Sequence, residues 1–456
     1  MKLPDLSRRD ALACGVRCLL AGSGLPLLAR LHALQEAATA GNPPASDYKA
    51  LVCVYLNGGN DSFNLIVPRN TADHAEYAAA RGNLAIPADQ LLPITPQRPQ
   101  GRAFGLHPSV PELQAMFEAG KLAFVVNVGT LLTPTTKAQY RNNAVPKPAQ
   151  LFSHSDQTTQ WYAQSAAAEG SNGWAGRMAD FVLELNQGSA LSPAITLAGS
   201  TRMLQGQTVV PYALGTNGSV QIAGTAGTRG QRRFAAFRAI LRKRHGHVME
   251  RQFADLQEQA IELDGLIRGA LAGQPPLQTQ FPGNSLGNQL RMVARMIAAR
   301  GALGAARQVF FVRLGGFDTH ADQLSFHPQL LSTLSLCLKA FQDAMVELGT
   351  ESMVTTFTVS EFGRTLGSNG SGTDHGWGGN QIVLGGAVRG RDLYGTWPSL
   401  AIDGPDDVGR GRLIPTTAVE QMGATLARWF GVAPGDLAAV FPRLGEFATS
   451  DLGFMA

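Results

Sequence analysis

Short apolar runs alternate with stretches of helical periodicity along this chain, which predicts an α/β fold with a mainly parallel sheet and helices on both faces. Four runs are too short for an average helix and predict buried strands. They are 51–56, 122–128, 309–314 and 353–359. Apolar residues that recur every three or four positions predict the helices. These cover 109–120, a segment that begins near 155, 174–186, 229–269, 285–300, 324–348 and 415–430.

Three segments depart from this alternation. Residues 192–225 alternate apolar and polar positions between glycine-containing turns, which predicts β-hairpins. Together with the helices that follow, they predict an insertion at about 190–300 within a single domain that spans 41–456. Residues 68–108 are polar and rich in proline, and 363–380 are rich in glycine, so both predict connections without regular structure.

Composition supports a folded chain with a large core. Of the 456 residues, 44% are hydrophobic and 16% are charged, so the chain can bury a core without disulfides and is not a disordered polymer. The 52 glycines indicate many turns. Of the four cysteines, Cys53 lies in a strand-like run and Cys337 in an apolar helical stretch, so both are predicted to be buried free thiols.

The first forty residues resemble an export signal. The segment from Ser7 to Leu12 contains the pair Arg8-Arg9 of a twin-arginine signal, and Ala38-Thr39-Ala40 fits a cleavage site. The apolar stretch is interrupted by Arg17 and is a poor membrane span, since a span needs about 20 apolar residues. We therefore expect a mature chain without a transmembrane anchor. The twin-arginine translocase would deliver it, already folded, to the periplasm or the medium; a cytosolic amphipathic helix is the alternative reading.

The net charge of +4 does not indicate a nucleic-acid-binding protein. Such proteins concentrate basic residues in a patch or stripe. The basic residues between Arg229 and His247 stand among apolar residues at helical spacing, which favours a solvated helix face. We therefore expect no nucleic-acid partner.

Polar groups of the ligand type follow three of the predicted strands. Because the carboxyl ends of parallel strands meet at one edge of a sheet, these groups are expected to lie together. Carboxylate oxygens and imidazole nitrogens suit Zn²⁺ or Mn²⁺. The candidate ligands, including the pair in the glycine-rich segment, are Asp61, Asp318, His320, Glu361, Asp374 and His375.

Each candidate also has a purely structural alternative. Asp61 fits an Asx turn or a helix cap, and Asp318 with His320 fits the start of the helix that follows. Glu361 has the nearby Arg364 as an ion-pair partner. The neighbours Asp374 and His375 fit a hydrogen-bonded pair within a loop.

The sequences of four motifs resemble those of a family of bacterial proteins exported by the twin-arginine route. The motifs are 51–68, Gly316-Phe317-Asp318-Thr319-His320, Ser360-Glu361-Phe362-Gly363-Arg364-Thr365 and Gly372-Thr373-Asp374-His375-Gly376. That family is catalogued as a domain of unknown function and is grouped by fold with alkaline phosphatases and sulfatases. The resemblance implies one or two divalent ions, Zn, Mn or Ca, beside a nucleophilic side chain that cleaves phosphate or sulfate esters.

The resemblance also implies roles for individual residues. It assigns Asp61 and the pair Asp374-His375 to one metal position, and Asp318 and His320 to the other. The nucleophile of such proteins stands at a helix N-terminus, where the best match is Ser153-His154-Ser155, with Ser155 or Ser153 attacking and His154 beside it. Helix capping is the alternative role for Ser155. Arg364, or backbone N–H groups of the glycine-rich segment, would hold the anionic oxygens of the substrate.

Two departures from the pattern bear on the function. No histidine follows His375, which leaves the second metal position short of a ligand, and His327 in its sequence context reads as structural rather than as a substitute. Cys53 lacks the Cys-x-Pro-x-Arg context of a sulfatase cysteine. The prediction is an exported metal-dependent hydrolase of a small or polymeric anionic ester, and the alternative is a non-catalytic exported binding or assembly protein. An oxidoreductase is disfavoured because Gly58-Gly59 lacks the dinucleotide-binding spacing.

Overall fold

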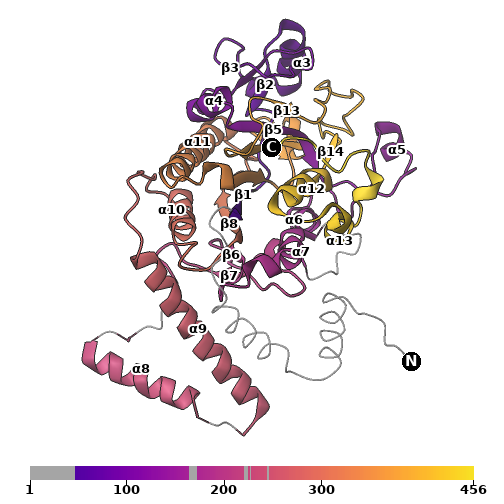
Figure 1. The fold of residues 1–456 in the computed structure, drawn as a ribbon. Helices are drawn as coiled ribbons and strands as arrows, with labels where there is room; N and C mark the ends of the chain where they lie inside the picture. Colours follow the sequence, from indigo (N-terminus) through magenta and orange to yellow (C-terminus); the bar gives the residue numbers. More distant parts are fainter. Residues whose placement is uncertain (1–46, 164–171, 220–223, 226, 244–245) are drawn as a thin grey trace, which may run out of the picture.

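The computed structural model describes residues 47–163, 172–219, 224–225, 227–243 and 246–456. Its centre is a sheet in the order β13-β5-β12-β9-β1-β8-β6-β7, with β14 paired to β5 (Figure 1). Every pairing in this sheet is parallel except the two that β12 makes with β5 and β9. Its strands are β1 (Lys49–Asn57), β5 (Leu122–Gly129), β6 (Ala194–Thr196), β7 (Tyr212–Ala213), β8 (Arg307–Gly315), β9 (Val354–Val359), β12 (Gly379–Leu384), β13 (Leu393–Tyr394) and β14 (Thr417–Ala418).

Strand β1 is buried on both faces, which explains its uninterrupted apolar sequence. Val52, Val54 and Leu56 point into one hydrophobic core, whereas Leu51 and Cys53 point into a second. Because side chains alternate along a strand, these two cores lie on opposite faces of the sheet. The mainly parallel α/β fold is therefore confirmed.

Helices cover both faces of the sheet (Figure 1). Leu113, Leu290 and Phe341 from three helices pack into the core that contains Val52. The helices on this face are α4 (Pro111–Glu118), α10 (Ser285–Ala298) and α11 (Gln323–Glu347). The helices on the opposite face are α6 (His154–Ala163), α7 (Trp174–Phe181), α12 (Val419–Phe430) and α13 (Leu437–Val440). The short helix α5 (Lys137–Arg141) contributes no buried residue.

The segment at 68–108 is more regular than predicted. It contains the helix α3 (Thr71–Arg81) and most of a small antiparallel sheet in the order β2-β4-β3. The strands of that sheet are β2 (Ile66–Pro68), β4 (Phe104–Leu106) and β3 (Leu92–Ile94). Each has only three residues, too few to show an alternating pattern against a polar and proline-rich background.

The prediction of hairpins at 192–225 is wrong. Strands β6 and β7 pair in parallel, and β6 also pairs in parallel with β8, so this segment extends the main sheet. The helix predicted at 229–269 corresponds to two helices, α8 (Gly227–Leu241) and α9 (Val248–Ala272), which project from the body (Figure 1). Arg238 of α8 and Arg242, which directly follows that helix, both pair with Glu258 of α9, so part of the basic face is neutralised here.

Two further predictions concern the cysteines and the membrane. Cys53 and Cys337 are both buried and free, as predicted. None of the helices within the described ranges is long and apolar enough to cross a membrane. The predicted twin-arginine signal at 1–40 lies outside the described residues.

Candidate metal centre

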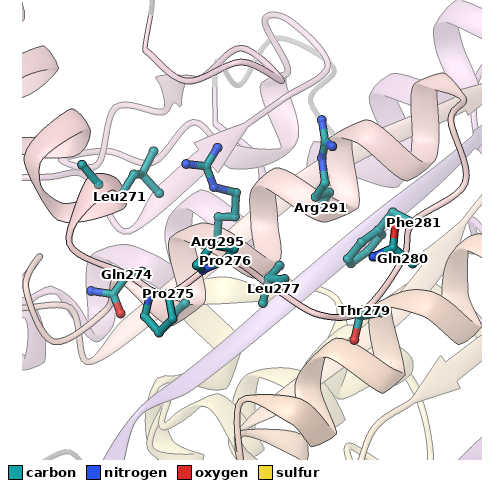
Figure 2. Close-up of a pocket in the computed structure, with 12 residues that line it drawn as sticks. Leu271, Gln274, Pro275, Pro276, Leu277, Thr279, Gln280, Phe281, Arg291 and Arg295 are labelled. Carbon is teal, nitrogen blue, oxygen red and sulfur yellow. The ribbon is translucent and has the colours of Figure 1, made fainter.

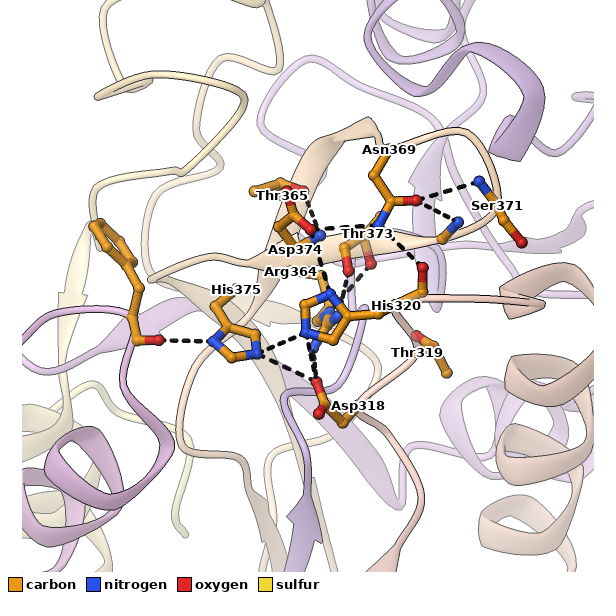
Figure 3. Close-up of polar contacts among 12 residues, drawn as sticks. Asp318, Thr319, His320, Arg364, Thr365, Asn369, Ser371, Thr373, Asp374 and His375 are labelled. Atoms are coloured by element: carbon orange, nitrogen blue, oxygen red, sulfur yellow. Dashed lines mark hydrogen bonds and ion pairs between the residues drawn. The ribbon is translucent and has the colours of Figure 1, made fainter.

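Five of the six predicted ligand residues come from the carboxyl ends of two strands and from a hairpin beside them. Asp318 and His320 follow β8, and Glu361 follows β9. The glycine-rich segment predicted as a loop holds the hairpin of β10 (Arg364–Ser368) and β11 (Thr373–His375), which brings His375 opposite Arg364. Figure 3 shows how Asp318, His320 and His375 point toward one another.

His375 directs one ring nitrogen at the backbone and the other at Asp318. Its Nδ1 lies 2.7 Å from the carbonyl oxygen of Phe152, and its Nε2 lies 3.3 Å from Oδ1 of Asp318. A carbonyl oxygen only accepts hydrogen bonds, so Nδ1 carries the proton. Burial lowers the pKa of His375, which favours the neutral ring. In that form Nε2 presents a lone pair to Asp318.

His154, the first residue of α6, repeats this arrangement with a carboxylate in place of the carbonyl. Its Nδ1 lies 2.8 Å from Oε1 of Glu361, and its Nε2 lies 3.4 Å from Oδ2 of Asp318. Glu361 is fully buried and also accepts a hydrogen bond from the backbone N–H of Gly58. The hydrogen bond with Glu361 raises the pKa of His154. The carboxylate therefore holds a proton at Nδ1 and turns Nε2 toward Asp318.

His320 completes the group. Its Nδ1 lies 3.3 Å from Oδ1 of Asp374, whereas its Nε2 lies 3.1 Å from Oδ1 of Asp318 and 2.9 Å from Nε2 of His375. The carboxylate of Asp374 acts on this ring as Glu361 acts on His154. Three imidazoles thus turn Nε2 toward a single carboxylate.

This donor set fits a divalent metal ion. Ligand atoms of His154, Asp318 and His375 all lie within 4.8 Å of one another. Two donors on a tetrahedral zinc ion, each at about 2.0–2.1 Å, are separated by about 3.3–3.4 Å. The Nε2-to-carboxylate distances of 3.1, 3.3 and 3.4 Å are close to that separation. A bound cation would also relieve the repulsion between lone pairs that face each other.

Glu361 and Asp374 were both predicted to be ligands, but the structure places them behind the imidazoles. Oδ2 of Asp374 lies 2.6 Å from Arg410, and its Oδ1 faces His320. Carboxylates that accept from the second nitrogen of a histidine fix the tautomer and the orientation of that ligand. These contacts favour a supporting role for Glu361 and Asp374, and their role as ligands stays a prediction.

Arg364 contacts the ligand Asp318 directly. Its side chain is buried and donates to Oδ1 of Asp318 at 2.7 Å, to the carbonyl oxygen of Gly58 at 3.0 Å and to the hydroxyl of Thr373 at 3.1 Å. Burial alone would raise the pKa of Asp318, yet the hydrogen bond and charge of Arg364 lower it. Arg364 therefore holds Asp318 ionised and in place, and its contact with a substrate stays a prediction.

Asp61, the sixth predicted ligand, contacts a different set of residues. Its buried carboxylate pairs with Arg81 of α3 and accepts from Gln323 of α11. The adjacent Asn60 contacts His327, which is itself buried. The ion pair with Arg81 favours a structural role for Asp61. Its Oδ1 is buried and has no hydrogen-bond partner among the described residues, so its role as a ligand stays a prediction. The burial of His327 favours the structural role that its sequence context predicts.

The predicted nucleophiles lie at the start of α6, on either side of His154. The hydroxyl of Ser153 donates to Oδ2 of Asp156 at 2.5 Å, and the hydroxyl of Ser155 donates to the same oxygen at 3.1 Å. Ser155 is exposed to solvent. A helix N-terminus favours negative charge on groups placed there. The nucleophilic role of these serines remains a prediction.

Two hollows differ in their relation to the centre. One, of about 550 Å³, lies between the end of α9 and α10 and is lined by Arg291, Arg295, Phe281 and a mixture of uncharged polar and apolar neighbours (Figure 2). It offers no histidine, cysteine or carboxylate for chemistry. Another, of about 470 Å³, is lined by His154 and Ser155 and adjoins the centre.

Comparisons with known proteins identify a family. Residues 48–438 match the family described as "Protein of unknown function (DUF1501)". No curated protein matches the chain in sequence.

Solved structures resemble the chain only remotely. The soluble domain of lipooligosaccharide phosphoethanolamine transferase A from Neisseria meningitidis is 7% identical, with 88% of this chain and 95% of that chain covered and a TM-score of 0.34. The lipoteichoic acid synthase LtaP from Listeria monocytogenes is 7% identical, with 89% and 78% covered and a TM-score of 0.33. The sulfatase PsFucS1 from Pseudoalteromonas sp. is 8% identical, with 88% and 72% covered and a TM-score of 0.33. Likenesses this weak assign no activity to the chain.

Proposed function

We propose that this chain, which belongs to the DUF1501 family, is a metal-dependent hydrolase of phosphate or sulfate esters. The proposal rests on one observation: His154, His320 and His375 turn Nε2 toward Asp318, while each Nδ1 faces an oxygen acceptor. These four residues would hold the ion. Three imidazoles and a carboxylate favour Zn²⁺ or Mn²⁺ over Ca²⁺, which prefers oxygen ligands.

A divalent ion, when bound, would supply positive charge that stabilises negative charge developing on the ester oxygens. The residues of the chain supply the remaining functions. Asp156 accepts from both serine hydroxyls and is placed to take the proton of the one that attacks. The serine oxygen would then bond to phosphorus or sulfur as the bond to the leaving oxygen breaks. Glu361, Asp374 and Arg364 keep the ligands oriented.

Ester turnover tests this function. The purified protein is stripped of metal, reloaded with Zn²⁺ or Mn²⁺, and assayed with p-nitrophenyl phosphate, bis(p-nitrophenyl) phosphate and p-nitrophenyl sulfate. We expect hydrolysis of at least one ester that depends on metal and is lost in Ser153→Ala, Ser155→Ala. Ser325→Ala, an exposed serine in the first turn of α11, is the matched control. If the double variant still hydrolyses the ester, water is the nucleophile and the two serines have no part in the mechanism.

One observation favours a second function, that of a non-catalytic metal-binding or assembly protein. Among the described residues, the hydroxyls of Ser153 and Ser155 contact each other and Asp156, and neither makes a hydrogen bond to His154. The serines thus lack a direct link to the centre. Bound metal without turnover of any ester would favour this alternative.

We also propose that the protein is exported in a folded state by the twin-arginine translocase and acts outside the cytoplasm. The motif at Arg8-Arg9 supports this proposal. Cell fractionation of a variant with both arginines replaced by lysine tests it. The variant should stay in the cytoplasm, and continued delivery to the periplasm would contradict export by this route.

A further inference from the structure

A cleft runs along the carboxyl ends of β1, β6 and β8, beside the metal centre. Its first lobe, of about 470 Å³, is lined by His154 and Ser155. Its second lobe has a volume of about 410 Å³. Asn57, Ala198 and Arg313 line both lobes, so the two adjoin and Arg313 lies where they meet. The cleft therefore extends away from the centre and has more room than one ester group needs.

The charge of this cleft has one sign. Arg313 lines both lobes and Arg202 lines the first, whereas no aspartate or glutamate lines either. Arg313 is exposed, and it makes no ion pair with any residue in the described ranges. Arginine offers several N–H donors in a planar fork that matches the oxygens of sulfate and phosphate.

The surroundings of Arg313 hold it in place. Gln289 of α10 bonds to both the backbone N–H and the carbonyl oxygen of Arg313, at 3.0 Å each. Phe311, two residues earlier on β8, lies on the same face of the strand and lines the first lobe. Its ring packs against the rings of Tyr55 and Tyr162, which gives the lobe an aromatic wall. The cationic group thus projects from a rigid strand and not from a loop.

We infer that the substrate is an extended polyanion with a second sulfate or phosphate group beyond the ester that is cleaved, and that Arg313 and Arg202 bind this second group. The inference rests on the proposed function, because it places the ester at the His154 end of the cleft. A small ester with a single anionic group would leave the lobe around Arg313 empty. The cleft therefore selects for chains that carry several anionic groups.

Binding of polyanions to the metal-free protein tests the inference without any need for turnover. The probes are dextran sulfate and inorganic polyphosphate, with uncharged dextran as the reference, measured by titration calorimetry. Arg313→Gln and Arg202→Gln should each weaken binding of at least one polyanion by about tenfold, as expected for loss of a charge-assisted hydrogen bond. Arg291→Gln is the matched control, because this exposed arginine lines the separate hollow of Figure 2. If the two arginine variants lose more affinity for dextran sulfate than for polyphosphate, the second group is a sulfate, and the opposite result identifies a phosphate.

The outcomes separate this inference from the proposed function. Unchanged affinity in Arg313→Gln, or an equal loss in Arg291→Gln, would overturn the inference even if simple esters are hydrolysed. Arginine-dependent binding of a polyanion in a protein that hydrolyses no ester would support the anion-binding cleft and refute the hydrolase.

Discussion

The Nε2 atoms of His320 and His375 lie 2.9 Å apart, although the Nδ1 atom of each ring already faces an oxygen acceptor. If both Nδ1 atoms carry protons, two neutral rings direct lone pairs at each other, which is unfavourable without a proton or a cation between them. Asp318 lies within 3.3 Å of both nitrogens and adds negative charge. The arrangement is therefore more consistent with a metal centre than with a network of hydrogen bonds.

The first prediction concerns the carboxylate behind His154. Glu361→Gln keeps the size of the side chain but replaces the charged acceptor of the Nδ1 proton with a neutral amide. Loss of such a supporting carboxylate lowers metal affinity by about 10–100-fold. Competition with a fluorescent zinc chelator measures this affinity. Glu184→Gln, an exposed glutamate elsewhere on the surface, should bind zinc as tightly as the unmodified protein does. Equal affinity in Glu361→Gln and the unmodified protein would show that Glu361 does not support the centre.

The second prediction distinguishes a structural Asp61 from a ligand. Asp61 and Arg81 form a buried ion pair, with 1% and 0% of their side-chain surfaces exposed. Asp61→Asn leaves the arginine charge unpaired, which should lower the free energy of unfolding by about 3–5 kcal/mol. Urea unfolding measures this loss, and elemental analysis of the folded fraction should find the metal content unchanged. If the Asp61→Asn variant folds but has lost its metal, Asp61 is a metal ligand.

The third prediction concerns the pH dependence of stability. Glu420 in the first turn of α12 is 2% exposed, and burial raises its pKa to about 8. In the unfolded chain this carboxyl ionises near its usual pKa of about 4.3. Its contribution to stability is therefore fully present below that value and is lost as the pH rises to about 8. The slope reaches at most about 1.4 kcal/mol for each pH unit.

Glu420→Gln removes this ionisation. Between about pH 5 and about pH 8, the free energy of unfolding should fall less in the variant than in the unmodified protein. Urea titrations at several pH values measure the difference. The exposed Glu446 provides a control, since Glu446→Gln should retain the original slope. Parallel curves for Glu420→Gln and the unmodified protein would refute the ionisation of a buried Glu420.

Sequence patterns predicted the fold well where burial is continuous. The apolar run of β1 indicated a strand covered on both faces, and the strand-end rule brought Asp318 and His320 to the edge where they are found. The same rule placed Asp61 at that edge, but its partner Arg81 comes from α3, which the polar pattern did not predict. A buried arginine also runs against the usual preference of this residue for the surface.

Roles within the centre were harder to predict than its location. Glu361 and His154 are far apart in sequence, and only the folded chain shows that one carboxylate oxygen faces Nδ1 and leaves Nε2 toward Asp318. Residue type identifies a carboxylate as a candidate ligand, but the atoms it faces decide whether it binds the metal or supports a histidine. Such contacts between distant segments leave no periodic signal.

The most direct measurement is the metal content of the folded protein. After removal of metal and reloading with Zn²⁺ or Mn²⁺, elemental analysis should find at least one ion per chain in the unmodified protein. His375→Ala and Asp318→Asn should lose most of it while circular dichroism shows an unchanged fold, and His247→Ala, an exposed histidine elsewhere, should retain it. An unmodified protein that binds no divalent ion, or a His375→Ala variant that keeps its full content, would contradict the metal centre.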